Sequence, residues 1–182
     1  MWEEALIWAV ADGAAVANTT TETLIFPATT IPANYMQDGR TLHIRAFGKY
    51  STTSTPTIIF GLRWGTATGG VLICKTAACT TPSSVTNAMF DLDIILTTRS
   101  NGSSGTIMGN GVARLFAAVA GTVASATGEG LVTPMSNGGV VTPAVATCDL
   151  TADTTLSLTA TWSAASASNT LTGLNYLIES LN

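Results

Sequence analysis

Apolar and polar side chains alternate along four segments of this chain, and no other feature of the sequence limits its fold so strongly. In residues 41–47, Leu42, Ile44 and Ala46 alternate with polar residues. Successive side chains of a β-strand point to opposite faces of the sheet, so a period of two predicts a strand with one buried face. The other segments with this pattern are 56–64, 90–96 and 156–162.

Clusters of turn-forming residues separate these segments. Gly, Pro, Asn, Asp and Ser gather at 37–39, 51–56, 65–70, 100–103, 137–139 and 164–169. Weaker β-prone runs at 23–26, 71–75, 105–108, 112–123 and 173–181 bring the expected total to about eight to ten strands. A helical turn is expected at 32–36, because Pro32 suits the first helical position. Together these patterns predict an all-β fold, an antiparallel jelly-roll-like β-sandwich with a short N-terminal arm.

The N-terminal segment, residues 1–20, differs from the sandwich domain expected over residues 21–182. Its apolar residues include Trp2, Leu6, Ile7, Trp8 and Val10. The segment is either an ordinary first strand of the sandwich or an arm that docks on a partner, since two tryptophans at a chain end are costly to expose. The second interpretation makes Trp2, Leu6, Ile7 and Trp8 the candidate partner-binding residues.

Charged residues are scarce, at 10% of the chain, whereas about 25% is usual for soluble domains. The net charge is −4 and the pI about 4.7, so no basic patch is available for nucleic acid or an anionic membrane surface. The longest nearly apolar stretches, 5–10 and 115–126, are shorter than the roughly 18 to 20 residues of a spanning helix. Such a charge-poor surface predicts that partner chains cover much of it.

The titratable residues form no pattern typical of catalysis or metal binding. His43, the single histidine, is expected on the polar face of a strand, facing solvent or hydrogen-bonding across strands. We therefore predict a protein that is not an enzyme, with no catalytic residue, metal or cofactor. Cys74, Cys79 and Cys148 are expected to be buried, inert thiols rather than to include a Cys74–Cys79 disulfide, because no secretion signal is visible.

Two residue pairs leave alternatives open. Asp91 and Asp93 share one face of a predicted strand, where they either join a calcium site or, more simply, pair with arginines across the sheet. The candidate arginines are Arg45, Arg63 and Arg99. Tyr50 and Trp64 lie near predicted strand ends, where they either pack in the core or at a subunit interface, the more usual outcome, or stack on sugar rings.

Part of the sequence resembles a recurring pattern of tailed-bacteriophage virion proteins. The residues Ile-Pro-Ala-Asn at 31–34 form a turn in that pattern, and a strand closed by glycine follows at 39–48. The similarity continues through 58–65 and 96–106 and covers residues 23–108. The resemblance implies a jelly-roll virion component, which in this family is often trimeric.

The resemblance also implies a function. It suggests a capsid decoration (cement) protein that binds between major capsid protein subunits on the outside of a phage head and stabilises the shell. The expected partners are then the chain itself, as a homotrimer, and the major capsid protein. The alternative is a receptor- or glycan-binding head domain of a phage tail or head fibre. Glu3 and Glu4 stand where a secretion signal carries positive charges, so synthesis in the host cytoplasm is expected.

Overall fold

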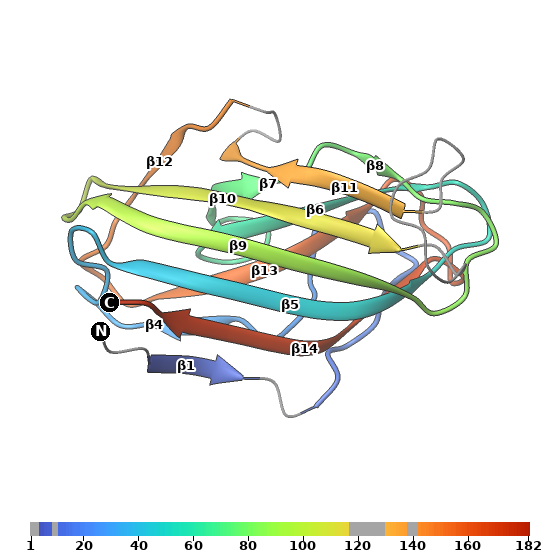
Figure 1. The fold of residues 1–182 in the computed structure, drawn as a ribbon, viewed down its shortest axis with the longest axis horizontal. Coiled ribbons are helices and arrows are strands. Elements are labelled where there is room, and N and C mark those ends of the chain that lie inside the picture. The colour runs from blue at the N-terminus through green and yellow to red at the C-terminus, as the bar shows by residue number, and fades with distance from the viewer. Residues whose placement is uncertain (1–3, 9–10, 117–129, 138–141) are drawn as a thin grey trace.

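The computed structural model describes residues 4–8, 11–116, 130–137 and 142–182, and these form two antiparallel β-sheets (Figure 1). The eight-stranded sheet has the order β1 (Glu4–Trp8), β14 (Thr170–Ser180), β5 (Thr41–Ser51), β9 (Ala88–Ser100), β10 (Gly105–Phe116) and β11 (Gly130–Met135). Two further strands lie outside this order: β12 (Val145–Cys148) pairs with β10, and β2 (Val16–Ala17) pairs with β14. The six-stranded sheet has the order β3 (Thr23–Leu24), β13 (Thr154–Trp162), β6 (Thr57–Trp64), β7 (Val71–Lys75); β4 (Thr29–Ile31) pairs with β13, and β8 (Cys79–Thr80) with β6.

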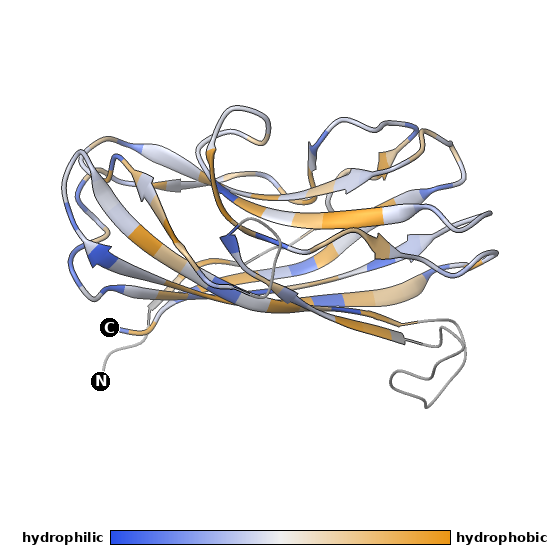
Figure 2. Ribbon diagram, turned by 90° about the horizontal axis from the view of Figure 1, so that it is seen from above, coloured by the Kyte–Doolittle hydropathy of each residue, from blue (hydrophilic) through white to orange (hydrophobic). Residues whose placement is uncertain are grey.

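The two sheets pack face to face and enclose one apolar core (Figure 2). Its inward side chains are those that the alternation predicts, and Ile44 of β5, Leu92 of β9 and Phe60 of β6 are almost completely buried. The predicted all-β antiparallel sandwich is therefore confirmed, whereas the jelly-roll order of its strands stays a prediction. Within the described residues, no helix is long and apolar enough to cross a membrane.

Two local predictions are wrong. Residues 105–108 and 112–116 belong to one continuous strand, β10, while 117–123 lie outside the described residues. Residues 32–36 form a turn instead of a helical turn: the Tyr35 amide donates a hydrogen bond of 3.1 Å to the Pro32 carbonyl. Asn34 has a φ of +58°, which cannot continue a right-handed helix.

Two glycines let the strands of the eight-stranded sheet approach the aromatic core. Gly48 of β5 and Gly173 of β14 lie opposite each other. A Cβ atom at Gly48 would lie 2.4 Å from the Phe90 ring, and one at Gly173 would lie 2.3 Å from the Phe26 ring. Phe26 stacks on Tyr176 with ring centroids 4.7 Å apart, so these rings have little room to move away.

We predict that Gly48→Ala destabilises the fold, because the added methyl group meets both the Phe90 ring and the Thr172 carbonyl oxygen, at 2.3 Å. Overpacking of this kind costs about 1–3 kcal/mol in the free energy of unfolding, which urea denaturation measures. Gly69→Ala is the control, since Gly69 is exposed in a turn and its nearest neighbour is the flexible Thr66 hydroxyl. Equal stability of the two variants would contradict this packing argument.

Candidate functional site

The outer face of the eight-stranded sheet carries an unusual share of exposed apolar side chains. The described residues include seven exposed large hydrophobic residues, and four of them point outward from this sheet. These four are Met89, Ile95, Val132 and Val145, with exposed fractions of 47%, 40%, 48% and 47%. We call the surface defined by these four residues the apolar sheet face.

Charged residues on the same outer face form short cross-strand contacts. His43 Nε2 lies 2.9 Å from the Asp93 carboxylate, and His43 Nδ1 lies 3.4 Å from that of Glu179. Arg114 Nη1 donates to Asp91 at 3.0 Å. The expected cross-strand role of His43 is therefore confirmed.

The arginine partners expected for Asp91 and Asp93 are wrong. Arg114 lies directly opposite Asp91 in the register of β9 and β10. Arg45 lies opposite Asp93, but its guanidinium carbon sits 5.4 Å from the centroid of the Phe47 ring. The other two candidates also lie elsewhere: Arg63, in β6 of the six-stranded sheet, pairs with Glu22 just before β3, and Arg99 forms no ion pair within the described residues.

The N-terminal candidate residues lie beside this sheet. β1 pairs with β14 as an edge strand of the same chain. Leu6 and Ile7 are partly buried and pack against the core. Trp8 ends β1, and Trp2 lies outside the described residues. Strand pairing agrees with the first-strand interpretation, and a partner-binding role for these residues stays a prediction.

The two aromatic residues considered for sugar stacking are core residues. Tyr50 is 1% exposed and Trp64 is 5% exposed. The Tyr50 hydroxyl donates to the Phe116 carbonyl at 2.8 Å, and the Trp64 indole donates to the Asp149 carbonyl at 2.9 Å. Neither ring offers a face to a sugar, so the interpretation as core packing is confirmed.

The three cysteines are free and buried, as the sequence predicts. Burial raises the pKa of the Cys74 thiol to about 12. Burial, together with the nearby Asp149 carboxylate, raises the pKa of Cys148 to about 11. A thiol with so high a pKa is a poor nucleophile at neutral pH, so these cysteines behave as small apolar residues.

The outer face of the six-stranded sheet has a different character, because hydroxyl groups line it. Along β13 the outward residues are Thr155, Ser157, Thr159 and Thr161. Ser157 and Thr159 are buried, and their hydroxyls donate to the Gly65 carbonyl and to the Glu22 carboxylate. At one end of this face an open groove with a volume of about 320 Å³ is lined by threonines 30, 66, 154 and 155 with Gly65 and Asp153.

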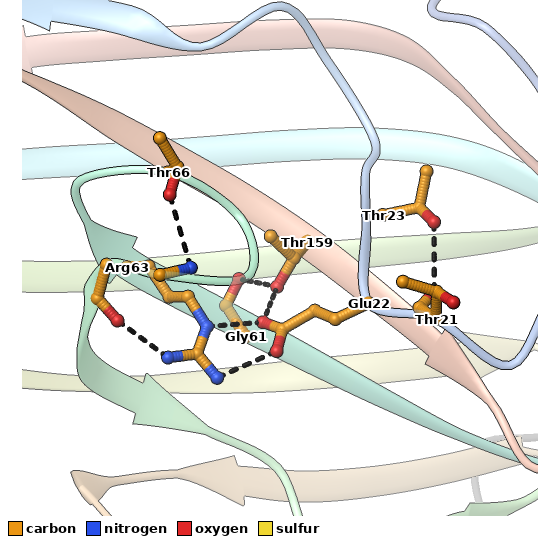
Figure 3. Close-up of polar contacts among 9 residues, drawn as sticks. Thr21, Glu22, Thr23, Gly61, Arg63, Thr66 and Thr159 are labelled. Carbon is orange, nitrogen blue, oxygen red and sulfur yellow. Dashed lines mark hydrogen bonds and ion pairs between the residues drawn. The ribbon is translucent and has the colours of Figure 1, made fainter.

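An ion pair that the sequence analysis missed lies at the centre of this face (Figure 3). Glu22, in the loop before β3, accepts hydrogen bonds from Arg63 Nε and Nη2, both at 2.7 Å. The Thr159 hydroxyl donates to Glu22 at 2.6 Å, and Arg63 Nη1 donates to the Gly70 carbonyl at 2.8 Å. Arg63 on the polar side of a predicted strand was a visible signal, but nothing in the sequence pointed to a partner 41 residues away.

These contacts shift the pKa values of Glu22 and Arg63. Burial alone would raise the pKa of Glu22, but the hydrogen bonds from Arg63 and Thr159 and the charges of Arg63 and Lys75 outweigh it, so the pKa lies below its ordinary value. The hydrogen bond to Glu22 raises the pKa of Arg63. Both groups are therefore charged at neutral pH and hold each other in a fixed position.

Beside this ion pair is a small hollow with a volume of about 90 Å³. Glu22, Ile59, Gly61, Arg63, Leu72, Lys75 and Thr161 line it. Gly61 of β6 forms its floor, since it lies between Thr159 of β13 and Lys75 of β7.

His43, the single histidine, contacts the Asp93 and Glu179 carboxylates. Among the described residues, no group of three or more His, Cys, Asp and Glu side chains is placed to hold a metal ion. The described surface therefore offers two features to explain, the apolar sheet face and the hollow beside Glu22.

Comparisons with known proteins add little to this picture. No family model matches the sequence, and no curated protein matches it either. A solved structure that shows some similarity is the CBM2 module of Lactobacillus casei BL23 phage J-1 evolved Dit, with a TM-score of 0.33 and 11% sequence identity. The similarity covers 84% of this chain and 67% of that chain. A TM-score this low supports no inference about function.

We predict that the stabilising effect of Glu22 depends on pH. Its lowered pKa means that the ionised carboxylate stabilises the fold above the ordinary pKa of 4.5, and that this contribution is lost as the pH falls through the lowered value. Glu22→Gln should reduce the free energy of unfolding by about 1–2 kcal/mol at neutral pH.

Urea denaturation of the parent protein and of Glu22→Gln between neutral pH and about pH 3 tests this prediction. The difference between their free energies of unfolding should shrink as the pH falls. Glu179→Gln is the control on the other sheet, where a half-exposed contact should be worth less than about 1 kcal/mol. If the difference in the free energy of unfolding between Glu22→Gln and the parent stayed constant over this pH range, the lowered pKa of Glu22 would be refuted.

Proposed function

We propose that this chain is a non-enzymatic structural protein of a bacteriophage particle that assembles with copies of itself through the apolar sheet face. The observation that carries the proposal is that Met89, Ile95, Val132 and Val145 are all exposed on one outer face of a charge-poor chain, with charged residues between them. Scattered apolar residues are normal on a protein surface, whereas a group on one face is typical of an interaction site.

The charges around this face favour a second copy of the chain as its occupant. The face carries Asp91, Asp93 and Glu179 alongside Arg45 and Arg114. Both signs on one surface allow a copy to present charges opposite to those it meets. Arg45 has no carboxylate within 4.0 Å among the described residues, which leaves it available to a neighbouring copy.

The virion role extends this assembly function. The resemblance of residues 23–108 to tailed-phage virion proteins supports a capsid decoration (cement) protein, a homotrimer on the capsid exterior that binds the major capsid protein. In this proposal the N-terminal residues Trp2, Leu6, Ile7 and Trp8 supply the attachment to the capsid or to a neighbouring subunit. Burying one large apolar side chain contributes about 1.5–3 kcal/mol. In this proposal the two tryptophans supply most of the binding energy, because Leu6 and Ile7 already pack partly against the core.

A second candidate function has its own observation. The outer face of the six-stranded sheet, with its threonine-lined groove and its charged hollow, suits a receptor- or glycan-binding head of a phage tail or head fibre. Sugar hydroxyls hydrogen-bond well to threonine, serine and charged side chains. The two functions use opposite faces of the sandwich, and the site of the protein on the particle discriminates between them.

We predict that the protein is a trimer in dilute solution and that Val145→Asp weakens the trimer at least about tenfold, because Met108 lies opposite it and the new carboxylate would be buried without a cation in the interface. Sedimentation velocity measures the oligomeric state, and circular dichroism checks that the variant is folded. Val71→Asp is the matched control, since Val71 is 40% exposed but lies in β7 of the other sheet. A monomeric parent protein, or an equal effect of both substitutions, would count against the proposal.

A further inference from the structure

We propose that the hollow beside Glu22 binds a single anionic group, a carboxylate or a phosphate, carried by a small ligand, and that Lys75 recognises it. Nothing in the assembly function requires this site, because it lies on the outer face of the six-stranded sheet, on the opposite side of the sandwich from the apolar sheet face.

The size of the hollow sets the class of ligand. Its volume of about 90 Å³ is that of roughly three water molecules, at about 30 Å³ each. A whole sugar or nucleotide needs a pocket of about 300 Å³ or more. The hollow therefore takes one substituent of a ligand, while the rest of the ligand lies over the outer face of the sheet.

The charges of the hollow select an anion. Each nitrogen of Arg63 already has a partner, because Nε and Nη2 donate to Glu22 and Nη1 donates to Gly70, which leaves one further N–H on each Nη. Glu22 neutralises Arg63, and three donors already occupy its oxygens. Lys75 is thus the remaining charge, with no carboxylate within 4.0 Å among the described residues. Two cations against one anion leave an excess positive charge in a chain whose net charge is −4.

The remaining walls suit an oxyanion. The Thr161 hydroxyl makes no side-chain hydrogen bond within the described part of the chain and lines the hollow from β13, so it supplies a second donor across β6 from Lys75 of β7. Ile59 and Leu72 supply apolar walls, which lower the local dielectric constant and strengthen the attraction between an ammonium and an anion.

The frame of the hollow is fixed before a ligand arrives. The doubly hydrogen-bonded Glu22–Arg63 pair joins the loop before β3 to β6, and Thr159 ties the same carboxylate to β13 (Figure 3). Gly61 leaves space at the bottom of the hollow because it has no side chain. A Cβ atom there would lie 2.9 Å from the Thr159 hydroxyl and 3.3 Å from Glu22. A site whose walls are held in place loses little entropy on binding.

Isothermal titration calorimetry of the full chain tests the proposal with three probes: glucuronate, inorganic phosphate and, as the neutral counterpart, glucose. We expect glucuronate or phosphate to bind with a millimolar Kd and glucose not to bind. The anion that binds more tightly shows whether the hollow takes a carboxylate or a phosphate. Lys75→Gln should weaken anion binding at least about tenfold. The matched control is Lys49→Gln, which removes the only other lysine of the chain, on the eight-stranded sheet, and should leave binding unchanged.

Failure to bind either anion would overturn the proposal, as would equal losses in the two lysine variants or glucose binding as tight as that of glucuronate. Gly61→Ala gives a second test, because it narrows the floor of the hollow and should also weaken anion binding. Sedimentation velocity of the same variants reports on assembly separately, so failure of this site and failure of the assembly function are distinguishable.

Discussion

The burial of every second side chain between two antiparallel sheets is the constraint on which this structure depends. The inward residues of β5, β9, β6 and β13 meet in one core, so each of these strands is held in a single register. A shift by one residue would bring His43 or Asp93 into the core and expose Ile44 or Leu92. Close approach at Gly48 and Gly173 completes the packing, since the Phe90 and Phe26 rings occupy the space of the missing side chains.

This constraint leaves the outward side chains free to differ between the two sheets. One outer face exposes Ile95 and Val132 among charges of both signs, which suits a neighbouring copy of the chain. The other carries the threonine-lined groove and the Glu22–Arg63 pair, which suits a polar ligand. A charge-poor sandwich can in this way join an assembly with one face and keep a binding surface on the other, and the two proposals do not compete for the same residues.

The sequence predicted the four central strands because their period of two reflects burial directly. It could not predict which residues meet across strands: Asp91 contacts Arg114 through the register of β9 and β10, and Glu22 reaches Arg63 from a loop. The sequence also could not show that 105–108 and 112–116 form one strand, because the residues between them include glycines. A Cβ atom at Gly109 would lie 2.4 Å from Ile73, so this glycine allows close contact between the two sheets.

In the proposed phage particle, copies of this chain cover one another's apolar sheet face. A three-dimensional image of the intact particle by electron cryomicroscopy would show this contact. We expect copies distributed over the head, with Ile95 and Val132 buried against a neighbouring copy. Copies whose apolar sheet face is open to solvent would contradict the claim, and copies confined to the tail would replace the decoration role by the receptor-binding one.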